Sequence, residues 1–375
     1  MLLSVNKMHL NLIISNKLFR FITFLFLAYT AYGCGEEANL TNTSIDPPSI
    51  DSLITDSLAL SSFRKESPFD LGDVQAKFYQ EIPYDSKVRT QFDIWIPESD
   101  VPTGLVLYTH GGGFTSGNKG TVYSPKKNGL WDWPKDIRYL LKNKIAFATI
   151  RYSLLDSVET EGIKKSINDV QRALQFIRHH DELLNLAKNR VVLIGNSAGA
   201  SISLLIALND ESANENSDDQ ILRESTRVQG VVVRETQASF NIEDRWTFDV
   251  FGDYDISFDE IFNLIRFRFL KFYGVSDMEE YETVEIDEYR KSVDMLELLT
   301  HDDPPLWVNN TLESLNHPLT SGLSLYHHPF HARALKEKAD EVGVENVCYY
   351  GKNPAIFSDP SNESWTDFCI RMISE

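Results

Sequence analysis

Short apolar segments alternate with longer segments of helical periodicity from Phe78 to the C-terminus. Residues 190–195 contain the run Val-Val-Leu-Ile, which is typical of a buried strand, and an apolar helical segment follows at 197–208. Because parallel strands need long crossover connections, this alternation predicts an α/β fold with a mostly parallel central sheet flanked by helices. Strands are expected at 92–96, 105–108, 145–152, 190–195, 228–233, 306–309 and 347–350, and helices at 163–180, 197–208, 330–342 and about 361–373.

Residues 240–300 break this alternation with an aromatic and acidic insertion between two predicted strands. We interpret the insertion as a helical cap over the carboxyl edge of the sheet, which is where ligands bind in open α/β folds. Most of its aromatic side chains are expected to form the core of the cap itself. They are Trp246, Phe248, Phe251, Phe258, Phe262, Phe267, Phe269, Phe272 and Tyr273.

Residues 1–33 have the organisation of a signal peptide, with three basic residues, no acid and an apolar run over 21–32. That run is too short for a comfortable membrane span. The segment Ala-Tyr-Gly-Cys ending at Cys34 resembles a bacterial lipobox. We therefore expect lipidation of Cys34 and a lipid-anchored or exported protein of the cell envelope. The alternatives are ordinary cleavage by signal peptidase or a start at Met8.

The polar segment 34–65 is expected to be a flexible tether, which leaves 66–375 as the folded domain. The chain has a formal net charge of −19, and so acidic a surface argues against nucleic-acid binding. No Cys/His metal spacing and no phosphate-binding loop is present in the sequence, so neither a metal nor a cofactor is expected. Cys348 and Cys369 are interpreted either as a disulfide pair or as separate core thiols.

Two glycine-rich motifs point to acyl-transfer chemistry. The pentapeptide Gly-Asn-Ser-Ala-Gly at 195–199 lies between a predicted strand and a predicted helix, the context of a G-x-S-x-G nucleophile elbow around Ser197. The tetrapeptide His-Gly-Gly-Gly at 110–113 ends an earlier strand and offers backbone N–H groups to an oxyanion. A nucleophilic serine and a set of oxyanion donors are two essential parts of an acyl-transfer site.

Through these motifs the chain resembles the hormone-sensitive-lipase-like esterases and the related bacterial feruloyl-esterase-like α/β hydrolases. The resemblance covers roughly 104–208 and returns at 303–308, and it implies an α/β-hydrolase fold and a serine hydrolase for carboxylic esters. The supporting positions of the family match Arg151, Tyr152 and Asp169. The resemblance also implies an oxyanion hole, which elbow geometry suggests independently, made by the N–H groups of Gly112, Gly113 and Ala198.

The nucleophile also needs a general base, and the base needs an acid to orient it. Aligning residues 306–311 with the family strand that precedes the acid puts Glu313 at the acid position. Glu235, which follows the strand at 228–233, is the alternative. Its neighbours Gln237 and Ser239 are candidates for lining the pocket.

The base is missing from its usual place. The loop after the last predicted strand reads Tyr-Tyr-Gly-Lys-Asn-Pro-Ala, and no histidine follows His331 in the sequence. The segment 326–331, Tyr-His-His-Pro-Phe-His, precedes a helix that begins at the active-site edge in the family. We therefore hypothesise that His327 or His328 reaches Ser197 and serves as the base. A metal bound to this histidine pair is not expected, because no carboxylate or cysteine lies at ligand spacing nearby.

These observations favour an exported serine esterase that acts on acyl or aromatic esters, including those of polysaccharides. The alternative is a weak or inactive hydrolase that binds an ester or glycan ligand in the same pocket, which the displaced histidine motivates. A scaffold protein that docks through its acidic cap is the third reading, and a strained elbow argues against it because a scaffold has no use for one.

Overall fold

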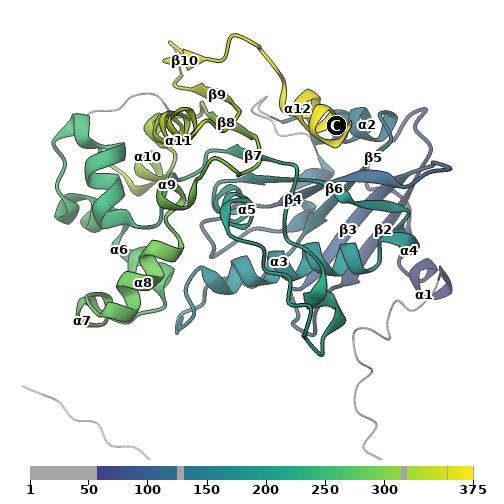
Figure 1. Cartoon of the computed structure of the whole chain (residues 1–375), viewed down its shortest axis with the longest axis horizontal. Coiled ribbons are helices and arrows are strands. Elements are labelled where there is room, and N and C mark those ends of the chain that lie inside the picture. Colours follow the sequence, from purple (N-terminus) through teal and green to yellow (C-terminus); the bar gives the residue numbers. More distant parts are fainter. Residues whose placement is uncertain (1–56, 125–130, 314–318, 353, 375) are drawn as a thin grey trace, which may run out of the picture. The chain divides into compact units, whose positions relative to one another are not determined.

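The computed structural model describes residues 57–124, 131–313, 319–352 and 354–374 (Figure 1). Over these ranges, ten strands form one sheet in the order β1-β2-β3-β5-β4-β6-β7-β8-β9-β10. The strands are β1 (Arg64–Lys65), β2 (Ala76–Pro83), β3 (Gln91–Pro97), β4 (Thr103–Thr109), β5 (Ile145–Ile150), β6 (Leu186–Asn196), β7 (Gly230–Arg234), β8 (Leu306–Asn310), β9 (Asn346–Tyr350) and β10 (Phe357–Ser358).

The middle of the sheet is parallel, from β5 through β4, β6, β7 and β8 to β9. The pairs β1/β2, β2/β3, β3/β5 and β9/β10 are antiparallel. This topology confirms the predicted α/β fold, and each strand expected from the sequence is present with slightly different ends. The carboxyl ends of β4, β6, β7 and β8 meet at one edge, where residues following these strands converge.

Helices precede, connect and follow the strands. They are α1 (Ser57–Ser61), η2 (Lys119–Tyr123), α2 (Trp133–Lys142), α3 (Lys164–His179), α4 (Asp181–Leu184), α5 (Ala198–Leu208), η3 (Gln220–Arg223), η4 (Ile242–Val250), η5 (Gly252–Tyr254), α6 (Phe258–Tyr273), α7 (Met278–Tyr281), α8 (Val284–Ser292), α9 (Met295–Leu298), α10 (Gly322–Tyr326), α11 (Pro329–Val342) and α12 (Trp365–Ser374).

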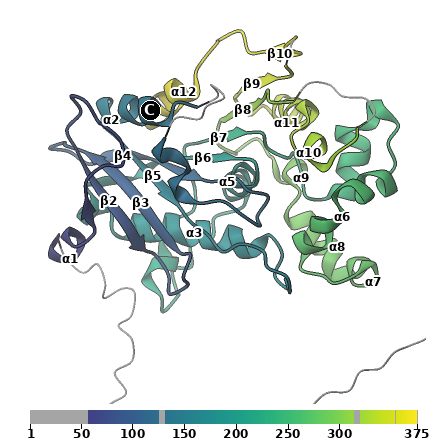
Figure 2. The same ribbon diagram turned by 180° about the vertical axis from the view of Figure 1, so that it is seen from behind.

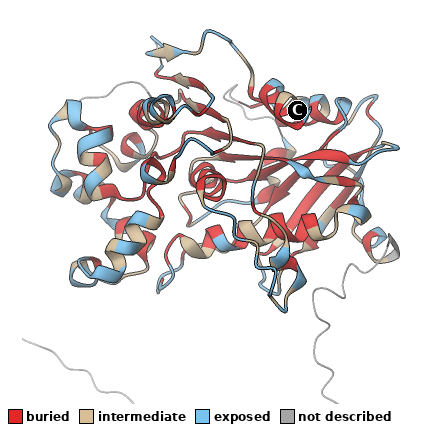
Figure 3. Ribbon diagram, in the orientation of Figure 1, coloured by how far each residue is buried: buried red, intermediate tan, exposed pale blue. Residues whose placement is uncertain are grey.

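Helices cover both faces of the sheet, as the two opposite views in Figures 1 and 2 show. Along β4, Leu105 and Leu107 join the core shared with α3 and α5, whereas Val106 and Tyr108 join the core shared with α2 and α12. Because successive side chains of a strand point to opposite faces, β4 is buried over its whole length. Figure 3 shows the same burial along the central strands.

The insertion between β7 and β8 is helical, with η4, η5 and α6 to α9 in succession. Both views place α6, α7 and α8 together, on the side of the sheet away from β2 and β3. Phe272 of α6 contacts Phe114, which follows β4, with ring centroids 5.9 Å apart. Among its aromatic residues, Trp246, Phe251, Phe269, Phe272 and Tyr273 are buried, whereas Phe248 and Phe267 are 74% and 84% exposed.

The structure corrects the expected tether at its C-terminal end. Residues 57–61 form α1, and Arg64 and Lys65 form β1, which pairs with β2. Leu60 is buried against the core, and burial of an apolar side chain is the reason this segment is folded. The predicted signal peptide and Cys34 lie outside the described residues. No helix among the described residues is long and apolar enough to cross a membrane.

Cys348 and Cys369 are separate buried thiols. Cys348 belongs to the core on one face of the sheet and Cys369 to the core on the other. Because the sheet lies between them, the two cysteines cannot form a disulfide. The alternative interpretation, that both are separate core thiols, is the one that holds. Burial raises the pKa of the Cys348 thiol to about 12, which keeps it protonated and unreactive at neutral pH.

Candidate active site

Ser197 occupies a strained turn between β6 and α5. Its φ and ψ are 53° and −125°, and its N–H donates to the Arg234 carbonyl at 2.8 Å. A Cβ added at Gly195 would lie 2.1 Å from the Gly199 carbonyl oxygen, and one added at Gly199 would lie 2.1 Å from the Thr109 carbonyl oxygen. Both glycines of the pentapeptide are thus required by close backbone approach, which is the geometry of a nucleophile elbow.

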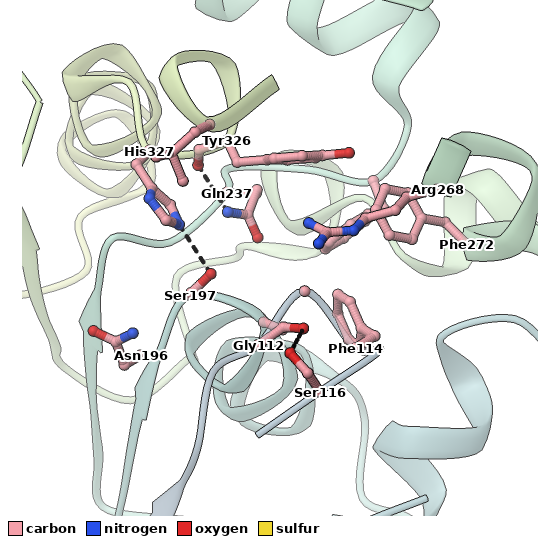
Figure 4. A pocket seen from close by; sticks show the side chains of 14 residues that line it. Gly112, Phe114, Ser116, Asn196, Ser197, Gln237, Arg268, Phe272, Tyr326 and His327 are labelled. Atoms are coloured by element: carbon pink, nitrogen blue, oxygen red, sulfur yellow. Dashed lines mark hydrogen bonds between the residues drawn. The ribbon is translucent and has the colours of Figure 1, made fainter. Parts of the chain in front are cut away.

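His327 lies beside this serine. Its Nε2 is 2.9 Å from the Oγ of Ser197, as Figure 4 shows. His327 ends α10, and its N–H donates to the Leu323 carbonyl at 3.1 Å. Of the two histidines proposed from the sequence, the structure therefore brings His327 to Ser197. With Nε2 accepting the hydroxyl proton, this contact has the geometry of a serine and its general base.

His328 points elsewhere, which corrects its assignment as a possible base. Its Nδ1 accepts from the N–H of Phe330 at 3.2 Å and caps the start of α11. Its Nε2 lies 3.1 Å from the hydroxyl of Tyr254. Burial lowers the pKa of His328 to about 4, so its ring is neutral and its acceptor nitrogen is occupied by the cap. Both ring nitrogens of His328 are thus engaged away from Ser197.

Two buried amides hold the segment that contains His327. The side chain of Gln237 donates to the carbonyl of Tyr326 at 2.7 Å and accepts from the hydroxyl of Ser201 at 2.8 Å. The side chain of Asn310, at the end of β8, donates to the carbonyl of His328 at 3.2 Å. The residues on either side of His327 are thereby tied to α5 and to the sheet.

The expected oxyanion donors lie on the same pocket. Gly112, Gly113 and Ala198 all line it together with Ser197. Over the described part of the chain, none of their three N–H groups donates to a protein acceptor. Gly112 and Gly113 have φ values of 128° and 59°, which favour glycine at these positions. N–H groups left open beside a serine nucleophile are what an oxyanion hole requires.

His110, the first residue of the tetrapeptide, supports the loop and does not face the pocket. Its ring stacks on Tyr152, with centroids 4.4 Å apart, and the Tyr152 hydroxyl donates to the His110 carbonyl at 2.8 Å. Its Nδ1 lies 2.7 Å from the Gly111 carbonyl oxygen. Burial lowers the pKa of His110 to about 4, so the imidazole is neutral. The packed ring fixes the strand end from which the glycines emerge.

Neither carboxylate proposed from the sequence hydrogen-bonds to His327. One oxygen of Glu235 accepts the N–H groups of Thr311 and Leu312 at 3.0 Å each, so this side chain holds the residues after β8. Its other oxygen is buried and has no hydrogen bond within the described ranges. Burial raises the pKa of Glu235 to about 7. Glu313 is half-buried, and its carboxylate makes no hydrogen bond to a described residue.

The pocket around Ser197 has a volume of about 290 Å³. Gln237 lines it, as the sequence suggested, whereas the hydroxyl of Ser239 caps the N–H of Asn241 at 2.8 Å and is buried away from it. The other described wall residues were not predicted from the sequence to line the pocket. They are Phe114, Ser116, Asn196, Phe240, Arg268, Phe272, Leu323 and Tyr326 (Figure 4).

Two of these wall residues adjoin the glycine motifs, since Asn196 lies within the pentapeptide and Phe114 follows the tetrapeptide. The others belong to no motif, because they come from the loop after β4, from the residues after β7, from α6 and from α10. Only the aromatic character of the cap was a signal, and it led to Phe272. The described residues contain no cluster of three or more metal-ligating side chains. What the arrangement can do chemically is attack a carbonyl carbon through Ser197 and stabilise the resulting oxyanion.

Comparison with known proteins gives the same fold. The model of the BD-FAE family matches residues 92–250, which include both glycine motifs. A truncated carbohydrate esterase from gut microbiota is 14% identical, with a TM-score of 0.56 over 83% of this chain and 100% of that one. Esterase B from Lactobacillus rhamnosis is 16% identical, with a TM-score of 0.53 over 85% of this chain and 89% of that one.

An acetyl ester-xyloside bifunctional hydrolase from Caldicellulosiruptor lactoaceticus is 14% identical, with a TM-score of 0.50 over 82% of this chain and 90% of that one. The sequence matches none of the curated proteins. At these identities the structural likeness establishes the fold, and the family match locates the shared motifs. The chain therefore has the α/β-hydrolase fold, and its residues 92–250 match the model of the BD-FAE family.

Proposed function

We propose that this protein is a serine hydrolase of carboxylic esters. The observation that carries the proposal is the 2.9 Å contact between Ser197 Oγ and His327 Nε2, in a pocket where open N–H groups gather. The strained backbone of Ser197 adds support, because a conformation of that kind costs free energy and persists at sites where it serves a function. The esterases that share the fold are consistent with this assignment.

In the proposed reaction, His327 Nε2 takes the hydroxyl proton of Ser197 while Oγ attacks the ester carbonyl carbon. The carbonyl electrons move to oxygen, and the N–H groups of Gly112, Gly113 and Ala198 hold this oxyanion. Collapse of the intermediate expels the alcohol, which receives its proton from His327. Water then attacks the acyl-enzyme by the same route and releases the acid and free Ser197.

We extend the proposal to acyl or aromatic esters of polysaccharides. The pocket wall carries aromatic rings from Phe114, Phe240, Phe272 and Tyr326, which suit an acyl chain, an aromatic acid or a sugar face. Support also comes from two proteins of this fold, a carbohydrate esterase and an acetyl ester-xyloside bifunctional hydrolase. Release of acetate or of a hydroxycinnamic acid from acylated plant polysaccharide tests this extension.

We also propose export and lipid anchoring through Cys34, which rests on the sequence of residues 1–34. Such an anchor would leave the hydrolase attached to a membrane without spanning it. Expression of the full chain in a bacterium, with fractionation beside a Cys34→Ala variant, tests the anchor. Wild-type protein in the membrane fraction and variant in the soluble fraction are the expected results, and equal partition of both contradicts the proposal.

The first test of the ester hydrolase is turnover of 4-nitrophenyl acetate by wild-type protein and by Ser197→Ala. We expect turnover in the wild type, none above background in the variant, and labelling of the wild type at Ser197 by a fluorophosphonate. Turnover that persists in Ser197→Ala contradicts the assignment of the nucleophile. Absence of both turnover and labelling favours the alternative of an inactive hydrolase that binds an ester or glycan ligand.

That alternative was motivated by the missing C-terminal histidine. His327 reaches Ser197 from a different segment, so the observation behind the alternative no longer favours it. The scaffold reading has no structural observation in its favour.

A further inference from the structure

Arg268 gives the pocket a positive charge. Apart from His327, it is the one basic side chain among the described residues that line the pocket, and neither Asp nor Glu is found among them. The whole chain has 55 Asp and Glu residues and only 36 Lys and Arg residues. A pocket lined by an arginine and by no described carboxylate therefore differs from the acidic composition of the chain. A cation in a partly enclosed pocket attracts anionic ligands.

The guanidinium of Arg268 is not neutralised by any residue that the structure describes. Within the ranges that the structure describes it makes no salt bridge and no hydrogen bond, and its recorded contact is with the ring of Tyr326, whose centroid lies 5.9 Å from Cζ. Three other arginines on or beside the cap have carboxylate partners. These pairs are Arg245 with Asp294, Arg290 with Glu243, and Arg333 with Asp253.

Arg268 reaches the reaction centre from α6. It is half-buried, and a Cβ added at Gly113 would lie 2.5 Å from its Nη1 and 2.8 Å from its Cζ. The guanidinium therefore packs directly over one of the proposed oxyanion donors. In Figure 4 its nitrogen atoms point across the pocket toward Ser197 and Gln237. A group bound by this guanidinium lies in the same pocket as the scissile ester.

We propose that the pocket selects esters that also carry a carboxylate, and that Arg268 binds this carboxylate. The inference rests on the proposed ester hydrolase and names its substrate class. A guanidinium pairs with a carboxylate through two parallel N–H···O bonds, which fixes the orientation of the ester as well as its charge. A neutral ester leaves the half-buried cation without a partner and loses those bonds.

The test compares two acetyl esters of matched shape, 4-acetoxybenzoate, which carries a carboxylate, and 4-acetoxybenzamide, which is neutral. We expect wild-type kcat/KM to favour the benzoate by about tenfold or more, the size of a hydrogen-bonded charge pair. Arg268→Gln is expected to remove this preference by lowering kcat/KM for the benzoate, with little effect on the benzamide. A second pair, monophenyl adipate and phenyl hexanoate, places the carboxylate on the acyl side of the ester.

Arg266→Gln is the matched control, because Arg266 lies on the same helix, is exposed and does not line the pocket. It should leave both preferences unchanged. The proposal is overturned if neither pair of esters shows a carboxylate preference in the wild type. It is also overturned if Arg268→Gln slows charged and neutral esters by the same factor, since that result assigns Arg268 to the oxyanion or to folding.

A binding measurement separates this inference from the proposed function. In Ser197→Ala protein the ester stays intact, so thermal shift can compare 4-acetoxybenzoate with 4-acetoxybenzamide without turnover. Stabilisation by the benzoate that disappears in Ser197→Ala/Arg268→Gln supports the carboxylate site even if the wild type hydrolyses nothing. Serine-dependent turnover without any such selectivity leaves the hydrolase standing and refutes the carboxylate site.

Discussion

The side-chain amide of Gln237 donates a 2.7 Å hydrogen bond to the backbone carbonyl of Tyr326, the residue before His327. Its carbonyl oxygen accepts from Ser201, one turn into the helix that starts at the nucleophile. One buried side chain thus links the two segments that bring Ser197 and His327 together. Gln237 comes after β7, so the link passes through a third segment of the chain.

Replacement of Gln237 by Glu should lower kcat with a small change in KM. A carboxylate can still accept from Ser201, but it cannot donate to the Tyr326 carbonyl and repels that oxygen, so His327 is held less well. We expect a loss of about tenfold or more in kcat. Ser201→Ala, which removes the other hydrogen bond, is the control and should cost less activity. Equal effects of both substitutions would contradict a positioning role.

Replacement of His327 by Ala should abolish most turnover, whereas replacement of His328 by Ala should mainly lower stability. Loss of the general base is expected to cost at least about a hundredfold in kcat. Loss of the N-cap at His328 costs about 1 kcal/mol of the free energy of unfolding. Steady-state kinetics and thermal melts of the two variants check this. A His328→Ala protein that folds but is as inactive as His327→Ala would refute the assignment.

Gly113→Ala should impair catalysis more than it impairs folding. The added Cβ meets the Arg268 guanidinium and strains a residue whose φ is 59°. Gly72→Ala provides a matched control, because Gly72 has a φ of 61° and nothing within 4 Å of an added Cβ. Both variants carry the same backbone strain, of about 1 kcal/mol. Their melting temperatures should therefore be similar, while kcat/KM should fall only for Gly113→Ala.

Glu235 should make the protein less stable as the pH rises from about 4.5 to 7. The folded pKa of about 7 exceeds the ordinary value of 4.5, so the folded state binds more protons in this window and stability is lost as the pH increases. Glu235→Gln stays neutral and can still accept from the two backbone N–H groups. Its melting temperature relative to wild type should rise between pH 4.5 and 8, and a constant difference would refute the raised pKa.

His331 should make the protein less stable as the pH falls, the opposite of the pH dependence expected from Glu235. Its Nδ1 accepts from the N–H of Ala238 at 3.2 Å, and its Nε2 lies 2.9 Å from the Leu325 carbonyl oxygen, which fixes a neutral ring. Burial lowers its pKa from 6.5 to about 3, so the folded state binds fewer protons and stability falls as the pH drops below 6.5. His331→Gln should show a shallower decline than wild type between pH 6.5 and 4 in thermal melts.

The sequence by itself determined the fold class and the candidate nucleophile, because both depend on local patterns. A buried sheet and the helices that cover it need apolar side chains at regular spacings, and these spacings can be read in the sequence. All the predicted strands and helices are present in the structure. The elbow around Ser197 requires small residues within one turn of backbone. The residues that identify it are therefore neighbours in the sequence. The positive-φ glycines Gly112 and Gly113 of the tetrapeptide likewise form a contiguous signature.

Only the tertiary structure decided which histidine faces the serine. His327 and His328 are adjacent, and the choice depends on the end of α10, the N-cap of α11 and the hydrogen bonds of Gln237 and Asn310. Glu235 likewise satisfies two backbone N–H groups after β8, a role invisible in a sequence. Arg268 lies on an aromatic helix between exposed Phe267 and buried Phe269, and the packing of α6 over Gly113 turns it into the pocket. Contacts between segments far apart in the chain leave no local pattern, so they could be found only in the folded protein.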